Sequence, residues 1–173
     1  MLELDDIQYI LITRVPALTG RYEFLSFREP AQGRTWLEAI REKVPSAKAV
    51  ANDSNLERRW VSVAFTWNGL RAVGMDEASL ATFPEEFRQG MSARWQVLGD
   101  AGANHPDNWV GGLAGPQLHA IAILFARDAA DRERSVREHR AFLARTPGVE
   151  VLSSLDLEPI PPFDYVREHF GYR

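Results

Sequence analysis

The 173-residue sequence contains no cysteine. Disulfide bonds, zinc–thiolate and iron–sulfur sites, catalytic thiols and thioether attachment of haem are therefore excluded. A metal ion would have to be bound by histidine, aspartate, glutamate, tyrosine or methionine side chains.

The sequence also lacks an excess of basic residues. It has 20 Lys and Arg against 24 Asp and Glu, which gives a formal net charge of −4 and a pI near 5.6. Binding to phosphate backbones depends on clustered positive charge. Nucleic acid is therefore not an expected partner.

Long apolar runs are missing as well. No run approaches the roughly 18 residues that a membrane-spanning helix requires. The first six residues include three acidic and no basic residues, whereas a signal peptide begins with basic residues. These features predict a soluble, cytoplasmic protein without a membrane partner.

The sequence does contain enough apolar material for one packed domain. Hydrophobic residues make up 45% of the chain and include nine Phe, five Trp and four Tyr. This content is too high for intrinsic disorder and is ordinary for a globular domain of this length.

Hydrophobic periodicity predicts an alternation of strands and helices. We expect a helix between Gly33 and Pro45 and another that begins at Asp128 and runs to Arg145. Apolar and β-branched segments predict four strands, at residues 21–28, 60–66, 118–127 and 149–157. The resulting order is that of an α+β, ferredoxin-like βαββαβ fold, with a four-stranded antiparallel sheet and helices on one face.

The connecting segments are less regular. The polar stretch 46–59 predicts an exposed loop, and Asn68 is expected to cap a short helix that runs to Val73. Residues 90–115 contain six glycines and no long periodic run, so we expect a long loop of functional interest. Phe83 and Phe87 lie four residues apart, a spacing that predicts packing on one helical face.

The four histidines do not have the spacing of a metal site. Neither a His-x-x-His nor a His-Glu-x-x-His pattern occurs among His105, His119, His139 and His169. We expect His119, in the third strand, and His139, on the following helix, to be partly buried, hydrogen-bonded structural residues. The sequence assigns no catalytic or metal-ligating residue.

Five segments carry a family resemblance. They are Leu4-Asp5-Asp6-Ile7-Gln8; Phe65-Thr66-x-x-Gly69-Leu70; Phe83-Pro84-x-Glu86-Phe87-x-x-Gly90-Met91-x-x-Arg94; Leu98-Gly99-Asp100 with Trp109; and Glu168-His169-Phe170-Gly171-Tyr172-Arg173. In order and spacing they closely resemble the N-terminal half of the dye-decolorising (DyP-type) haem peroxidases. Tyr9 departs from the pattern, because many relatives have glycine after the Asp-Ile-Gln triplet.

The resemblance implies a two-domain enzyme of which this chain is the first half. The family folds as two ferredoxin-like domains whose sheets pack together, and its C-terminal domain holds most of the haem b. The first three positions of the family's Gly-x-x-Asp-Gly signature are filled by Gly171, Tyr172 and Arg173. The distal aspartate, the distal arginine and the proximal histidine lie beyond Arg173 in the family's order.

These implications lead to specific expectations. Residues 1–157 form the N-terminal domain, and residues 158–173 form a tail that leads into the distal haem loop. Within this tail, Glu168, His169, Gly171 and Arg173 are the residues expected to approach haem, the alternative being a tail without a partner. We expect this chain alone to bind haem weakly and to be inactive, as the product of a truncated or split gene or as a proteolytic fragment.

A second hypothesis needs no catalysis. A ferredoxin-like sheet with helices on one face leaves its other face available, and apolar residues occur on both sides of the predicted strands. The chain would then be a dimerisation or partner-binding module. Both hypotheses predict that a C-terminal haem-binding half or a second copy covers this face, and that the isolated chain forms a homo-oligomer.

Overall fold

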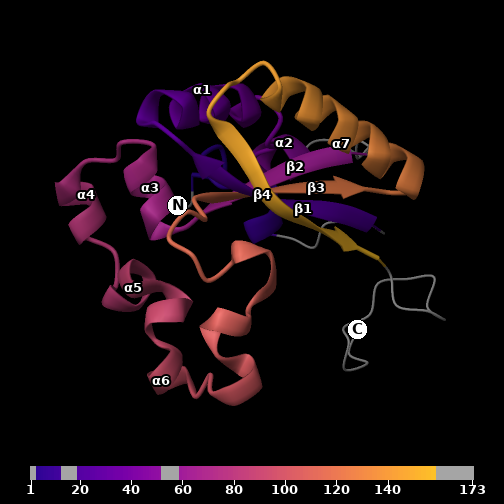
Figure 1. Ribbon diagram of the computed structural model, residues 1–173. Helices are drawn as coiled ribbons and strands as arrows, with labels where there is room; N and C mark the ends of the chain where they lie inside the picture. Colours follow the sequence, from indigo (N-terminus) through magenta and orange to yellow (C-terminus); the bar gives the residue numbers. More distant parts are fainter. Residues whose placement is uncertain (1–2, 13–18, 52–58, 159–173) are drawn as a thin grey trace.

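The computed structural model describes residues 3–12, 19–51 and 59–158. Its centre is a four-stranded sheet (Figure 1), with every neighbouring pair of strands antiparallel. The strands are β1 (Thr19–Phe27), β2 (Arg59–Phe65), β3 (Ala120–Ala126) and β4 (Val149–Leu157), in the order β2-β3-β1-β4. The predicted ferredoxin-like fold is confirmed, and β4 has the predicted bounds.

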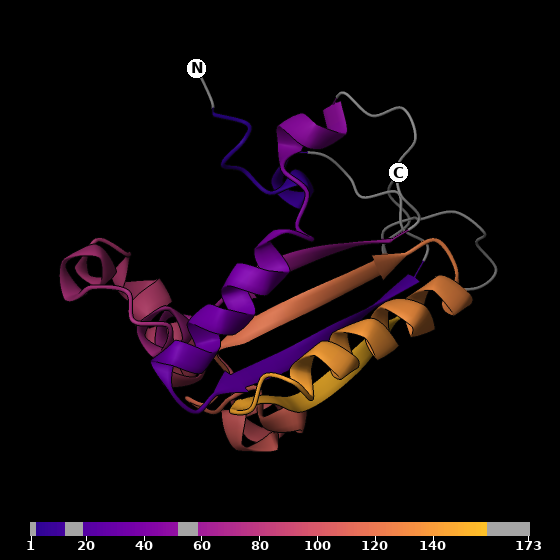
Figure 2. The same cartoon turned by 90° about the horizontal axis from the view of Figure 1, so that it is seen from above.

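Two long helices cover one face of the sheet. Helices α1 (Pro30–Arg41) and α7 (Ala129–Leu143) lie side by side over the strands (Figure 2). Helix α1 begins before Gly33 because Pro30 is suited to the first helical turn, where a missing N–H costs no hydrogen bond. Helix α7 begins as predicted, since the Asp128 carboxylate accepts a hydrogen bond from the backbone N–H of Asp131.

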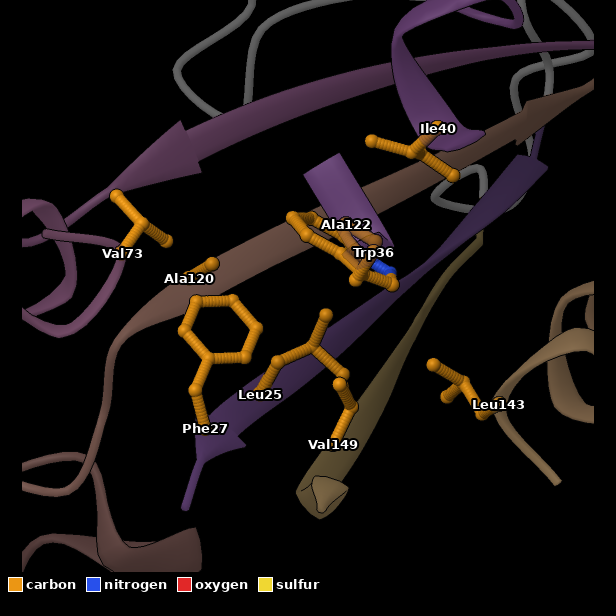
Figure 3. Packing of buried hydrophobic residues seen from close by; sticks show 9 residues of the cluster. All are labelled: Leu25, Phe27, Trp36, Ile40, Val73, Ala120, Ala122, Leu143 and Val149. Carbon is orange, nitrogen blue, oxygen red and sulfur yellow. The ribbon is translucent and has the colours of Figure 1, made fainter. Parts of the chain in front are cut away.

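The hydrophobic core lies between these helices and the sheet. Trp36 is fully buried against Phe27, with their ring centroids 5.5 Å apart. Small residues of β3, Ala120 and Ala122, leave room for these rings under α1. Figure 3 shows the cluster, which consists of Leu25, Phe27, Trp36, Ile40, Val73, Ala120, Ala122, Leu143 and Val149.

The segments predicted as loops contain short helices. Residues 47–51 form α2 (Ala47–Ala51), because the Ser46 hydroxyl accepts a hydrogen bond from the N–H of Ala49 and so caps the turn. Residues 52–58 lie outside the described residues. Helices α3 (Trp67–Ala72) and α5 (Glu85–Ala93) lie where the sequence does predict short helices. The remaining short elements are η1 (Tyr9–Leu11), α4 (Glu77–Ala81), α6 (Trp95–Leu98), η2 (Gly102–Asn104), η3 (Pro106–Asn108) and η4 (Val110–Gly112).

The prediction of a long loop at residues 90–115 is therefore wrong. The segment consists of single turns of α- and 3-10 helix, which are too short to produce a periodic hydrophobic pattern. Gly99 has a φ of 78° and ends α6, a conformation that favours glycine. In the part of the chain that the structure describes, no helix is both long enough and apolar enough to cross a membrane.

Candidate functional site

The sheet face opposite α1 and α7 is lined by apolar and aromatic side chains. The residues of this face, termed here the second face, alternate with those of the core along each strand. On the second face, the rings of Trp60 and Phe125 stack with centroids 5.9 Å apart, and Tyr22 meets Phe24 edge to face at 6.2 Å. Leu155, on the edge strand β4, is 56% exposed. Such a face is suited to packing against another apolar surface.

Residues 85–112, termed here the lobe, lie on the same side of the sheet as the second face, away from α1 and α7 (Figure 1). The lobe contacts the sheet at η4, where a Cβ at Gly111 would lie 2.5 Å from Ser153 Oγ. Its large exposed apolar side chains are Phe87, Met91, Val97, Leu98 and Val110. The lobe therefore continues the apolar character of the second face.

Internal contacts hold the lobe together. The ring of His105 packs edge-on against Trp95 with centroids 4.6 Å apart, and Trp109 Nε1 donates to the carbonyl of Asn104 at 2.9 Å. Phe83 and Phe87 pack together as predicted, with centroids 5.0 Å apart. These half-buried tryptophans anchor the short turns of the lobe.

The Phe65-Thr66-x-x-Gly69-Leu70 motif fastens α3 to the beginning of β3. Thr66 Oγ1 donates to the carbonyl of Leu118 at 2.6 Å and accepts from the N–H of Gly69 at 3.0 Å. The N-cap is thus Thr66, and the prediction of Asn68 is wrong because the helix begins at Trp67, two residues earlier than an Asn68 cap would place it. A Cβ at Gly69 would lie only 1.7 Å from the carbonyl oxygen of His119, so the approach of α3 requires glycine.

The Leu4-Asp5-Asp6-Ile7-Gln8 motif protects the edge of the sheet. The side-chain amide of Gln8 donates to the carbonyl of Val63 at 2.9 Å and accepts from its N–H at 3.0 Å. Since β2 is an edge strand, these bonds occupy backbone groups that a neighbouring strand would otherwise pair with. The motif is structural in the described part of the chain.

His119 is positioned by the backbone of β1. It lies immediately before β3, and its Nδ1 accepts a hydrogen bond from the N–H of Phe27 at 2.8 Å, so Nε2 carries the proton of the neutral ring. Burial lowers the pKa of His119, which favours this neutral form. The predicted hydrogen-bonded structural role is confirmed, although the residue lies just outside the strand.

A polar cluster is buried between β1 and α7. Glu23 is fully buried and contacts both His139 Nδ1 and Arg140 Nε. Burial alone would raise the pKa of Glu23, but the hydrogen bonds from His139 and Arg140 outweigh it and hold the pKa below its ordinary value. The structural role predicted for His139 is confirmed. Its partner Glu23 was not anticipated, because a single glutamate among apolar strand residues carries no signal of burial.

The described residues do not fit a haem site. Both ring nitrogens of His139 are engaged, and His119 borders a cavity of about 360 Å³ lined by the polar side chains of Asn68, Arg71 and Glu77. Cofactor pockets are mostly apolar. Within the described ranges, no group of three His, Asp or Glu side chains gathers that would hold a metal ion. The residues predicted to approach haem, Glu168, His169, Gly171 and Arg173, lie outside the described residues.

Comparison with known protein families decides the assignment. A family model described as the DyP dimeric alpha+beta barrel domain matches residues 6–154. The chain belongs to the DyP family. The match includes most of the second face, the lobe, three of the five motif segments and residues 6–8 of the first, and the family model itself is that of a dimeric domain.

Solved structures show the same fold. A fungal DyP-type peroxidase from Auricularia auricula-judae aligns with a TM-score of 0.79 at 21% identity, over 99% of this chain and 36% of that chain. An ancestral D-type dye decolorizing peroxidase aligns with a TM-score of 0.80 at 23% identity, over 98% of this chain and 38% of that one. The present chain thus spans little more than a third of the length of these DyP structures. A comparison with curated protein sequences gives no match.

Proposed function

We propose that this DyP-family chain acts as the N-terminal half of a haem b peroxidase that reduces hydrogen peroxide and oxidises organic substrates. The observation that carries the proposal is the match of the DyP domain to residues 6–154. The fold supports it, since structures of DyP-type peroxidases superpose on almost the whole chain.

In this proposal, residues 1–157 are the N-terminal domain and residues 158–173 lead toward the haem. Glu168, His169, Gly171 and Arg173 would then approach the cofactor from this tail. When bound, haem supplies the redox centre for peroxide reduction and substrate oxidation. The protein must add an axial ligand to iron, a group that moves the peroxide proton and a cation that stabilises developing charge.

The described residues contribute none of these groups in a suitable arrangement, so we propose that the chain alone is inactive. Its contribution is the second face, onto which a C-terminal haem-binding half or a second copy of the chain packs. Leu155, at the edge of this face, and the exposed apolar side chains of the adjoining lobe supply the contact surface. The dimeric nature of the DyP domain supports the presence of a covering partner.

A haem titration of the purified 173-residue chain tests this function. We expect no saturable Soret band and no oxidation of an organic dye when hydrogen peroxide is added. Supplying the C-terminal half of a DyP peroxidase, fused after Arg173, should produce both. Saturable haem binding with turnover by the chain alone would show that the present assignment of catalysis to another half is wrong.

A binding module without catalysis is the second candidate, favoured by the exposure of Leu155 beside the aromatic residues of the second face. The same fusion separates the two functions. If the fused protein folds and binds haem through its C-terminal half but has no peroxidase activity, the module is supported over the enzyme.

A further inference from the structure

A second hollow lies on the opposite side of the sheet from the proposed partner surface. It is a cleft of about 790 Å³ between the end of α1 and helix α7, and it reaches Trp60 on the edge strand β2. Figure 2 shows these helices side by side above the sheet, with β3 visible between them. This volume falls within the range of pockets that bind small organic molecules.

The inner part of the cleft is apolar. Ile40 of α1 and Leu124 of β3 are almost completely buried, and both line the cleft together with Val61 of β2. The aromatic ring of Tyr9 and the pyrrolidine ring of Pro45 extend this lining on the side of η1. An aromatic or short aliphatic body would lose its contact with water there, which favours binding.

The carboxylates around the cleft are already engaged. Glu138 Oε2 accepts from Arg59 at 2.9 Å, and Glu42 Oε1 accepts from Arg41 at 3.3 Å. Asp131 is buried and also has an interaction partner. The negative charges that line the cleft are therefore neutralised or held by other residues.

Two cations around the same cleft differ in this respect. Lys43, after the end of α1, and Arg134, on α7, both line the cleft. Among the described residues, the side chains of Lys43 and Arg134 form no hydrogen bond or ion pair, whereas the side chains of most charged residues around them do. The cleft thus combines an apolar interior with unpaired positive charge on two separate elements.

We propose that this cleft binds a small amphipathic organic anion, a carboxylate or sulfonate attached to an aromatic or short aliphatic body. The body lies on Ile40, Val61 and Leu124, and the anionic group lies between Lys43 and Arg134. Guanidinium groups bind carboxylates and sulfonates through charge-assisted hydrogen bonds, which are stronger than neutral ones. The half-buried hydroxyl of Ser135 adds a further donor along the same wall.

Titration of the 15N-labelled chain with 2-naphthoate tests the proposal by NMR. We expect saturable shifts of backbone amides in residues 40–44, in Val61 and in residues 134–135. Binding should weaken as ionic strength rises, because the anionic group is held near the surface. Shifts confined to the second face, or shifts that do not saturate, would overturn the proposal.

Single substitutions test whether the positive charges of Lys43 and Arg134 are needed for binding. Arg134→Ala is expected to weaken 2-naphthoate binding roughly tenfold, as for the loss of one charge-assisted hydrogen bond. Lys43→Ala should weaken it in the same direction. Arg137→Ala removes an exposed arginine of the same helix that does not line the cleft, and it should leave the affinity unchanged. If Arg134→Ala and Arg137→Ala weaken 2-naphthoate binding equally, the ligand does not bind in the cleft.

A neutral ligand provides the remaining control. 2-Naphthamide has the same aromatic body without the negative charge, so we expect it to bind at least about tenfold more weakly. Equal affinities for the acid and the amide would show that the cleft does not select an anion. Circular dichroism of each variant verifies that the fold is retained.

Discussion

Trp36 Nε1 donates a hydrogen bond of 3.2 Å to His139 Nε2 inside the core. An indole nitrogen can only donate, so Nε2 of the imidazole is the acceptor and the ring proton resides on Nδ1. Nδ1 then donates to the carboxylate of Glu23. This geometry assigns a neutral His139, and the charge of Glu23 is balanced by Arg140.

Removal of the buried Glu23 carboxylate, the partner of Arg140, should therefore destabilise the fold. We expect Glu23→Ala to lower the free energy of unfolding by about 3–5 kcal/mol, because it breaks a buried polar network and leaves His139 and Arg140 without their acceptor. Urea unfolding followed by circular dichroism measures the change. The control is Glu150→Ala, which breaks an exposed pair with Arg28 and should cost no more than about 1 kcal/mol. Similar losses in both variants would contradict the importance of the buried cluster.

The pH dependence of stability should carry the signature of Glu23. Because the pKa of Glu23 is lower in the folded chain than the ordinary value of about 4.3, its ionised form stabilises the fold above that pH. The stabilisation is lost as the pH falls through the lowered pKa of the folded state. Glu23→Gln should accordingly narrow the stability difference between pH 7 and pH 3. If the free energy of unfolding changes with pH equally in the parent chain and in Glu23→Gln, Glu23 does not contribute to the pH dependence. The hydrogen bond from Arg21 also lowers the pKa of Asp156. Ionised Asp156 therefore stabilises the fold in the same direction, and it does so in both the parent chain and the Glu23→Gln variant.

Gly69→Ala should disrupt the junction of α3 and β3. The added Cβ would lie 1.7 Å from the carbonyl oxygen of His119, so α3 must move or Thr66 must give up its bonds. We expect a loss of at least about 3 kcal/mol in urea unfolding. Gly99→Ala is a useful comparison, because a Cβ there meets no atom within 4 Å and only the positive φ is unfavourable. Its cost should be about 1–2 kcal/mol. A smaller loss for Gly69→Ala than for Gly99→Ala would be incompatible with the observed packing.

Association through the second face can be tested at its exposed edge. We expect light scattering of the isolated chain to give a mass above that of one 19.5 kDa chain. Leu155→Lys places a charge on the second face and should shift the chain toward monomer, because burying an unpaired charge is unfavourable. Ser154→Lys is the matched control on the opposite face of the same strand. A monomeric parent chain, or equal effects of the two lysines, would contradict association through this face.

The sequence predicted the features that depend on long periodic segments. The strands and the helix that begins at Asp128 are read directly from apolar segments and helical spacing. The short helix α2 and the turns of the lobe after α5 were missed, because single turns are fixed by local caps and tertiary contacts rather than by periodicity.

The candidate site was predictable only in part. An apolar second face follows from hydrophobic residues on both sides of the strands, and the structure shows Trp60 and Phe125 stacked there. The burial of Glu23 and the edge contact of Gln8 depend on residues more than 50 positions away, so no local pattern reveals them. Glutamine and glutamate in these positions look like ordinary surface residues in the sequence.

The Gln8 side chain has a consequence for how copies of this chain can assemble. Because it occupies the backbone groups of Val63 on the outer edge of β2, strand-by-strand growth of the sheet is blocked at that point. Contact through the second face pairs two surfaces and then stops, whereas contact through a free edge could repeat without limit. A single amide near the start of the chain therefore favours closed, finite assemblies over open-ended fibres.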